Sequence, residues 1–207
     1  MRLLHVESSP RKSRSASREA ALAFIEAWRG LHPDGTIDTL DVWTTDLPAF
    51  DGAAMEAKYA GLAGQALTPE QQAVWDGIRA LADRFHRADV IVISAPMWNF
   101  GIPYRLKHLI DAISQKDVLF TFDERGLLGL LGGRKAVLIA ARGVALGEGF
   151  PAAEFDYQVA YLKAWCRMVG ITDIFTVEIE KTLYGPEADT ASRVEARGTA
   201  QALARAI

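Results

Sequence analysis

The sequence contains a single cysteine, no long apolar run and no excess of basic residues. Cys166 cannot close a disulfide within the chain, and its apolar, helix-like surroundings indicate a buried structural thiol rather than a catalytic one. No apolar run approaches the roughly 18 residues of a membrane span, and Glu7 comes too early for a signal peptide. The formal net charge is −3 with both signs interspersed, so no basic face is expected. These absences favour a cytoplasmic protein that binds neither membranes nor nucleic acid.

Two common nucleotide-binding fingerprints are also missing. Neither the GxxxxGK[ST] phosphate loop nor the GxGxxG dinucleotide motif occurs in the chain. None of the histidines has the spacing of metal ligands, so no metal site is expected. Any ligand site must therefore be built from other elements.

The chain does contain a regular alternation of apolar strand-like runs and amphipathic helical segments. Its 207 residues are expected to form one domain, residues 1–207. Strands are expected at Arg2–Glu7, Thr36–Trp43, Asp89–Ser94, Lys135–Ala141 and Asp173–Glu180. Helices are expected after the first strand, from the capping box at Thr68, and over Pro103–Ile113, Asp156–Gly170 and Pro186–Ala206. This pattern predicts an α/β fold: a doubly wound, five-stranded parallel sheet in the order 2-1-3-4-5, with helices on both faces.

Three further features are expected within this pattern: a buried helix face, a long loop and a hairpin. The first helix should bury one continuous face, which consists of Ala21, Phe24, Ile25, Trp28 and Leu31. The segment between the second strand and Thr68 is interpreted as a long loop. Residues 117–126 have strand-like composition and interrupt the alternation, with a hairpin turn expected at Asp123 and Glu124.

The loop after the first strand, ESSPRKSRSAS, is rich in serine and basic residues. Hydroxyls at Ser9, Ser15 and Ser17 and the amides of the opening helix can surround a phosphate, because the first helical amides lack partners. Arg11 and its basic neighbours add positive potential. Plain helix capping is the alternative interpretation.

Two further loops follow the central strands. Residues 96–101 (PMWNFG) offer aromatic and thioether contacts and the amide Asn99, which suit a flat flavin ring; the alternative is that they plug the core. Residues 141–149 contain three glycines, which indicate either a closely approached loop or an ordinary connection. In the predicted strand order, all three loops meet at one crevice, where ligands of such sheets bind.

Several segments resemble the FMN-dependent NADH azoreductases, a flavodoxin-like family that also reduces quinones. The stretch Ser94–Asp111 is similar to the PMYNFNIP segment of that family. Further matching segments span nearly the whole chain in the same order: the serine loop, Gly126–Ile139, Ala141–Gly143, Gly170–Asp173 and Tyr184–Glu187. The resemblance implies FMN-binding positions at Ser9, Ser15, Ala16, Ser17, Met97, Trp98, Asn99, Phe100, Ala141, Arg142, Gly143 and Val144.

The chain departs from this family at some of these positions. The family's Ser-Arg-Gly-Gly is here Ala141–Val144, so a hydroxyl is lost and a β-branched residue replaces glycine. The usual Tyr of the second loop is Trp98, and the Gln of the first loop is Ala16. We expect the changes in the third loop to alter the substrate side more than FMN binding.

The resemblance implies a two-electron, ping-pong reaction with non-covalent FMN. Hydride would pass from NADH to flavin N5, and a quinone or an aromatic azo compound would then be reduced at the same face. No catalytic acid or base is expected from the protein, because protons can come from water. A flavodoxin-type electron carrier is the alternative, although its phosphate loop and strong acidity are missing. The sequence leaves open which oxidant is physiological and whether NADH or NADPH is preferred.

Residues 155–170 form a helical segment that is apolar on two sides. One stripe contains Val159 and Cys166, and the other contains Tyr161, Trp165 and Met168. Such a helix needs a second neighbour, which is either a larger core or another subunit. The resemblance implies a homodimer with the flavin at the interface. The residues expected to line the substrate pocket are Phe100, Phe122 and Met168.

Overall fold

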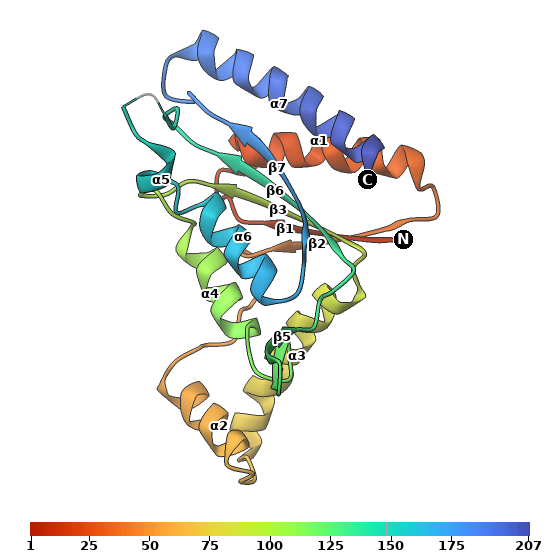
Figure 1. The fold of residues 1–207 in the computed structure, drawn as a ribbon, viewed down its shortest axis with the longest axis vertical. Helices are drawn as coiled ribbons and strands as arrows, with labels where there is room; N and C mark the ends of the chain where they lie inside the picture. The colour runs from red at the N-terminus through yellow and green to blue at the C-terminus, as the bar shows by residue number, and fades with distance from the viewer. Residues whose placement is uncertain (148) are drawn as a thin grey trace.

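The computed structural model describes residues 1–147 and 149–207, which form a parallel sheet with helices on both faces (Figure 1). The sheet has five strands in the order β2-β1-β3-β6-β7. Their bounds are β1 Arg2–Glu7, β2 Thr36–Asp41, β3 Val90–Pro96, β6 Lys135–Ala141 and β7 Asp173–Ile179. Counted over the strands of this sheet, the order is the predicted 2-1-3-4-5, so the predicted fold class is confirmed.

The strand register brings the carboxyl ends of the strands to one edge of the sheet. Glu7 pairs with Asp41 of β2 and with Ser94 of β3. Ala141 at the end of β6 pairs with Ile179 at the end of β7. We call this the carboxyl edge; every loop that leaves it is a candidate for ligand binding.

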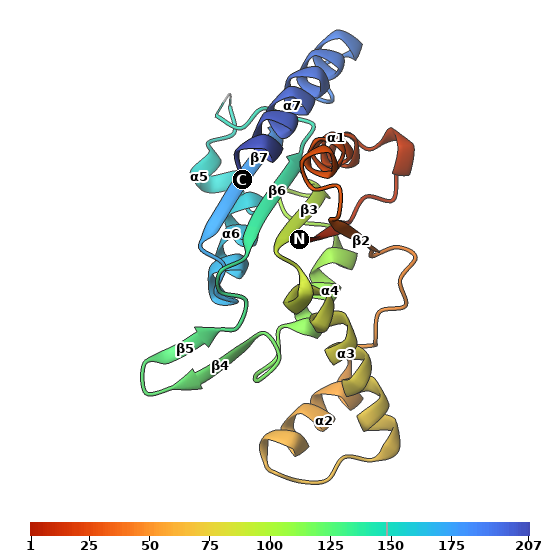
Figure 2. The same cartoon turned by 90° about the vertical axis from the view of Figure 1, so that its right-hand side faces the viewer.

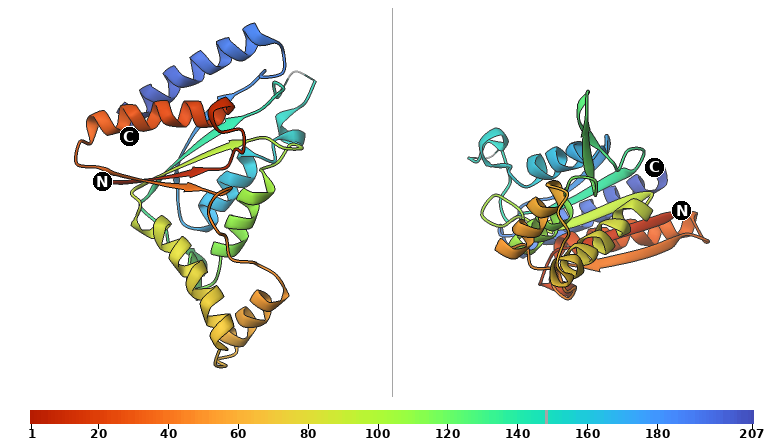
Figure 3. Two further views of the ribbon diagram at one scale, coloured as in Figure 1. Left: turned by 180° about the vertical axis from the view of Figure 1, so that it is seen from behind. Right: turned by 90° about the horizontal axis from the view of Figure 1, so that it is seen from below.

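The helices form two layers. Helices α1 (Ala16–Leu31) and α7 (Pro186–Ala206) pack together on one face of the sheet. Helices α3 (Pro69–Arg87), α4 (Tyr104–Ile113) and α6 (Val159–Met168) cover the other face (Figures 1 and 3). Within the described ranges, none of the helices has the length and apolarity needed to cross a membrane.

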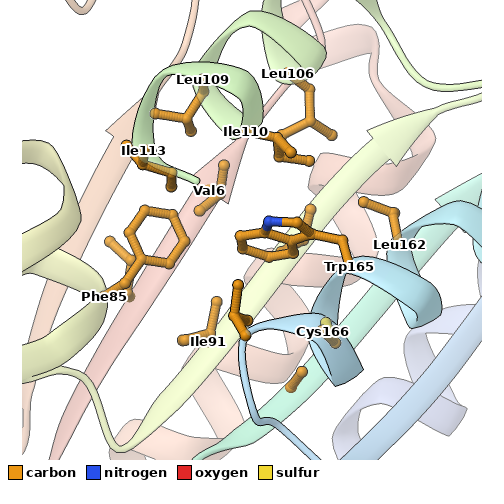
Figure 4. Packing of buried hydrophobic residues seen from close by; sticks show 14 of the residues in the cluster. Val6, Phe85, Ile91, Leu106, Leu109, Ile110, Ile113, Leu162, Trp165 and Cys166 are labelled. Carbon is orange, nitrogen blue, oxygen red and sulfur yellow. The ribbon is translucent and has the colours of Figure 1, made fainter. Parts of the chain in front are cut away.

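The α3–α4–α6 face has a large apolar core (Figure 4). The rings of Phe85 and Trp165 meet edge to face, with centroids 6.0 Å apart. The indole Nε1 of Trp165 donates to Ser114 Oγ at 2.9 Å, so this buried ring keeps a polar partner. Cys166 is buried in the same cluster, and burial raises the pKa of its thiol to about 12. It is therefore a protonated, structural side chain, as predicted.

The predicted apolar face of the first helix is confirmed except at its last residue. Phe24 and Trp28 are fully buried against the sheet, but Leu31 is 53% exposed. Because α1 ends at Leu31, this side chain passes beyond the core. The ring of His32 stacks on Trp28 instead, with centroids 4.6 Å apart.

Helix α2 (Gly52–Leu62) occupies part of the segment that was expected to be a loop. Asp51 caps its start by accepting from the amides of Ala53 and Ala54. Only Ala54 and Ala57 are buried in it, so it shows no large apolar stripe in the sequence. It packs on α3, and the two helices extend away from the sheet (Figure 2). Helix α3 begins with the predicted capping box at Thr68.

A two-stranded hairpin interrupts the alternation where the composition predicted one. Strands β4 (Phe120–Asp123) and β5 (Gly126–Gly129) pair antiparallel and stand out from the body (Figure 2). The base of the hairpin is fixed by a close approach of two backbones. A Cβ atom at Gly129 would lie 2.0 Å from the amide nitrogen of Gly170, so only glycine fits there.

Candidate functional site

The loops at the carboxyl edge are tied to one another through backbone hydrogen bonds. The Ser8 amide donates to the Ser94 carbonyl at 3.1 Å, and the Ser8 hydroxyl donates to the same oxygen at 2.8 Å. The Met97 amide donates to the Ala141 carbonyl at 2.6 Å. These bonds continue the sheet beyond its strands, so the first, second and third loops lie side by side.

The first loop leads from β1 through the 3₁₀ turn η1 (Lys12–Arg14) into α1. Ser15 is the N-cap of α1, and its hydroxyl accepts from the Arg18 amide at 3.3 Å and lies 3.2 Å from Ser17 Oγ. Ser9, Ser15 and Ser17 are all buried. The amides of the first helical turn have no carbonyl partner within the helix and favour an anion. Capping and anion binding are therefore compatible here, although they appeared as alternatives in the sequence.

The basic residues of this loop do not all contribute free positive charge. Lys12 has a left-handed backbone with φ 51° and its ammonium pairs with both Glu7 and Asp41. Arg18 binds the other oxygen of Glu7 at 2.8 Å. Burial alone would raise the pKa of Asp41, but the hydrogen bonds from Lys12 and from the Trp43 amide lower it below its ordinary value. Lys12 thus closes the loop rather than presenting an unpaired charge.

A buried histidine lies beneath the first and second loops. His5 Nε2 is 2.9 Å from the Ser94 hydroxyl, and the side chain is 1% exposed. Burial is the main reason that its pKa falls to about 4, against the opposing effect of Glu7. His5 is therefore neutral at physiological pH and serves as a hydrogen-bonding link between β1 and β3.

The second loop contains a strained turn. Trp98 and Gly101 pair across it, and the two residues between them, Asn99 and Phe100, have φ values of 49° and 66°. Positive φ at both central positions defines a turn that normally uses Asn-Gly. A bulky aromatic residue there is an outlier, and such strain is typical of ligand-binding positions.

The two aromatic side chains of this turn lie in different surroundings. Trp98 has Trp43 and Tyr104 as ring neighbours, with centroids 5.9 and 6.2 Å away. Trp43 is itself fixed, because its Nε1 donates to the Ser8 carbonyl at 2.9 Å. Trp98 also lines a cavity of about 730 Å³ that runs along α4. The aromatic residues lining this cavity are Phe50, Trp98, Tyr104, Tyr157 and Tyr161.

Phe100 points to the third loop. Its ring centroid lies 5.8 Å from that of Phe150 and 4.9 Å from that of Phe155, which belongs to α5 (Ala152–Phe155). Phe150 and Phe155 also meet edge to face at 5.4 Å. The sequence analysis did not single out Phe150 or Phe155. The feature that could have indicated them is the pair of Phe residues directly after the glycine-rich loop.

The third loop is covered by Thr182 and Leu183, which follow β7 and which the sequence analysis did not place at the site. The amide of Leu183 donates to the Gly143 carbonyl at 3.1 Å, and a Cβ atom at Gly143 would lie 2.5 Å from Leu183 Cδ1. Leu183 thus approaches Gly143 closely, although this exposed side chain could turn away from a larger residue. Val144 is half-buried. Residue 148 of this loop lies outside the described residues.

Ala141 and Arg142 both face the protein interior. The side chain of Ala141 packs in the core beneath α1 and α7. Alanine, in place of the family's serine, therefore makes an apolar contact there. The guanidinium of Arg142 is buried and pairs with Asp156, Glu178 and Glu180.

Phe122 and Met168 lie apart from Phe100 within one chain. Phe122 is 56% exposed on β4, in the hairpin that stands out from the body (Figure 2). Met168 ends α6, where Gly170 contacts the base of the hairpin, and it packs against the core. Neither residue lines the cavity beside Trp98. Over residues 1–147 and 149–207, no cluster of His, Cys, Asp or Glu side chains is arranged to hold a metal ion.

Comparison with known proteins identifies the family. A family model described as "Flavodoxin-like fold" matches residues 1–204. The chain belongs to the flavodoxin-like fold family. Among the curated members, an "FMN-dependent NADH:quinone oxidoreductase 2" of Pseudomonas syringae is 56% identical over 207 residues, which covers 100% of this chain and 99% of that protein. An "FMN-dependent NADH:quinone oxidoreductase 9" of Burkholderia lata is 50% identical and covers 99% and 98%.

Solved azoreductase structures match the whole fold. An azoreductase from Bacillus anthracis superposes with a TM-score of 0.91 at 27% identity, covering 100% of both chains. An FMN-dependent NADH-azoreductase from the same species, solved in complex with FMN, has a TM-score of 0.86 at 28% identity and covers 98% of this chain and 99% of that one. The predicted resemblance to azoreductases and quinone reductases is confirmed.

Proposed function

We propose that this protein is an FMN-dependent NADH:quinone oxidoreductase that also reduces aromatic azo compounds. The observation that carries the proposal is the meeting of a helix start surrounded by buried serine hydroxyls with a strained aromatic turn at one edge of the sheet. A phosphate and a flat ring are the two ends of FMN. Whole-length relatives with this printed activity support the enzyme over an electron carrier of the flavodoxin type.

The residues at the carboxyl edge fit the parts of FMN. The buried hydroxyls of Ser9, Ser15 and Ser17, with the first-turn amides that include those of Ala16 and Ser17, suit the phosphate. The remaining proposed contacts suit the ring and its ribityl chain: Met97, Trp98, Asn99 and Phe100, together with the backbone of Ala141, Arg142, Gly143 and Val144. When bound, FMN supplies the two-electron chemistry between NADH and the oxidant.

The protein's own side chains supply position and desolvation rather than proton transfer. Phe100, Phe150 and Phe155 form an apolar wall beside the second and third loops, which excludes water from that side. The buried ionisable groups near these loops are engaged or neutral: Arg142 is held by carboxylates, and His5 is uncharged. We therefore propose that no residue acts as catalytic acid or base and that protons come from water.

We also propose that the protein works as a homodimer. Five of the residues that line the cavity beside Trp98 are Phe, Trp or Tyr, and its rim exposes Tyr104 and Tyr157 at 64% and 63%. Exposed aromatic groups gathered on one face are typical of interfaces. In a dimer, Met168 and the exposed Phe122 would line the pocket of the second chain, since they lie away from Phe100 in their own. Light scattering at micromolar concentration should give about twice the chain mass of 22.6 kDa, and a fully active monomer would contradict the proposal.

A cytoplasmic location and NADH as the reductant complete the proposal. The single cysteine, buried as a free thiol, is compatible with a reducing compartment. The relatives' names support NADH, and assays with NADPH in parallel would test this preference.

Steady-state kinetics test the proposed function. Initial rates with varied NADH and benzoquinone should depend on added FMN and give parallel double-reciprocal lines, which indicate ping-pong kinetics. Intersecting lines would contradict the shared binding face. No oxidation of NADH by the FMN-loaded protein, with any quinone or azo dye, would contradict the enzyme itself.

A further inference from the structure

Arg142 is the most completely enclosed cation at the carboxyl edge. Its side chain is 2% exposed and lies among three carboxylates. Nη1 is 3.2 Å from Asp156 Oδ2 and Nη2 binds Glu178; Nε lies 2.9 Å from Glu180 Oε1 as an ion pair without hydrogen-bond geometry. The carboxylates outnumber the guanidinium, so it presents no unpaired positive charge to a ligand.

These carboxylates come from the elements that surround the third loop. Glu178 belongs to β7 and Glu180 follows that strand, whereas Asp156 precedes α6. Two of them also hold backbone amides: Asp156 accepts from Val159 at 2.8 Å, and Glu180 accepts from Leu146 at 3.0 Å. A single side chain therefore connects β6, β7, the start of α6 and the third loop itself.

The backbone of Arg142 and Gly143 is hydrogen-bonded to β7 and to the segment that follows it. The Arg142 amide donates to the Ile179 carbonyl at 2.8 Å. The Arg142 carbonyl accepts from the amide and the hydroxyl of Thr182 at 3.4 and 3.2 Å, and the Gly143 carbonyl accepts from Leu183 at 3.1 Å. Both of these carbonyls consequently point to the segment that follows β7.

The direction of the next two amides follows from peptide geometry. In a planar trans peptide, the N–H points opposite to the C=O of the preceding residue. The amides of Gly143 and Val144 must then point away from the segment after β7. Since β6 lies between β7 and β3 in the sheet, they face the side of the second loop, where Met97 bonds to Ala141.

We propose that Arg142 is a positioning residue whose side chain does not touch FMN. Its guanidinium fixes the third loop to β7 and α6, so that the Gly143 and Val144 amides are aimed at the flavin ring. This assignment rests on the proposed function, because it places the ring between the second and third loops. It gives the Arg142 side chain a positioning role and leaves contact with the ring to two backbone donors, which favour electron-rich forms of a bound ring.

The first test compares Arg142→Met with Arg142→Lys and a control. Without the guanidinium, Asp156, Glu178 and Glu180 repel one another and release the loop. FMN affinity of the apoprotein should fall roughly tenfold or more, as expected when about one hydrogen bond is lost, and the visible circular dichroism of bound flavin should change. Lysine, with one ammonium, should restore stability in part but not the flavin signal, because it lacks the guanidinium fork.

The matched control is Arg84→Met. Arg84 binds both oxygens of Asp38 at 2.7 and 2.6 Å, on β2 and α3, away from the third loop. Its loss should leave FMN affinity and the flavin spectrum unchanged. A wild-type FMN affinity and spectrum in Arg142→Met would overturn the assignment.

Glu180→Leu separates positioning from direct contact. If Arg142 positions the loop, removing its partner weakens FMN binding, because Leu146 and the guanidinium both lose an anchor. If the guanidinium bound FMN directly, freeing it from a carboxylate would strengthen binding, and that result would overturn the proposal. Glu180→Leu also tests the assignment if Arg142→Met fails to fold. Wild-type protein that binds no FMN would overturn the proposed function and this assignment together, whereas wild-type binding with unchanged variants would overturn this assignment alone.

Discussion

Trp98 and Gly101 exchange backbone hydrogen bonds in both directions, at 3.0 and 2.9 Å. This exchange closes a two-residue turn and forces Asn99 and Phe100 into the left-handed region. The irregular backbone after β3 is therefore a closed, hydrogen-bonded turn, and its strain lies beside the proposed ring site.

Substitution of Asn99 separates the role of its backbone from that of its side chain. Asn99→Ala places a Cβ at positive φ without a polar side chain, so its free energy of unfolding should be about 1 kcal/mol below that of Asn99→Gly. Both variants lose the carboxamide and should bind FMN equally weakly. Denaturant unfolding and FMN titration check the two statements, and normal FMN affinity in Asn99→Gly would exclude a side-chain contact.

The serine hydroxyls of the first loop should contribute to phosphate binding. Ser15→Ala with Ser17→Ala should weaken FMN binding by about 1 to 3 kcal/mol, the usual effect of unmade charged hydrogen bonds. Loss of the Ser15 cap should also lower stability by about 1 kcal/mol.

Thr68→Ala is the control for this double variant. Thr68 caps α3 by accepting from the Gln71 amide, so its loss should destabilise the protein by a similar amount. FMN affinity should not change. Equal FMN affinity in the serine double variant and in the control would remove the first loop from the phosphate site.

Gly129→Ala should strongly destabilise the protein. The new methyl group would meet the Gly170 backbone, which cannot turn away as a side chain can. We expect a loss of about 3 kcal/mol or more in the free energy of unfolding. At Gly132 the corresponding contact is an ordinary 3.8 Å, so Gly132→Ala should stay within about 0.5 kcal/mol. Similar unfolding midpoints for the two variants would contradict the close contact at the hairpin base.

His5 should make the protein less stable as the pH falls from about 6.5 to 4. Its pKa is about 4 when folded and 6.5 in the unfolded chain, so between these values the unfolded state binds the extra proton. The stability lost across this window should be about 3 kcal/mol. His5→Gln keeps an amide for the Ser94 hydroxyl but cannot titrate, so its stability should vary less with pH. Asp41, with its lowered pKa, acts below this window, and identical pH profiles for both proteins would contradict the assignment to His5.

Local sequence patterns predicted the central sheet and most of the helices that cover it. The central strands lack polar alternation and the helices repeat apolar residues on one side, so the sheet order and the loops at its carboxyl edge followed from the sequence. The serine loop and the PMWNFG loop could be placed at this edge because each directly follows a buried strand.

Features that depend on tertiary contacts could not be predicted in the same way. Helix α2 buries only small alanines, so its periodicity is weak. The packing of Phe100 on Phe155 and the cover of Gly143 by Leu183 join segments that are distant in sequence. The motif marked Arg142 as important, but the direction of its side chain depends on carboxylates up to 38 positions away along the chain.

Anaerobic stopped-flow absorbance of the FMN-reconstituted protein tests the central claim most directly. Mixing with NADH should bleach the flavin absorbance, and a second mix with benzoquinone or an azo dye should restore it fully; the faster oxidant identifies the preferred substrate class. Bound FMN that NADH cannot bleach would contradict the account, because the fold would then hold the cofactor without the proposed reductase activity.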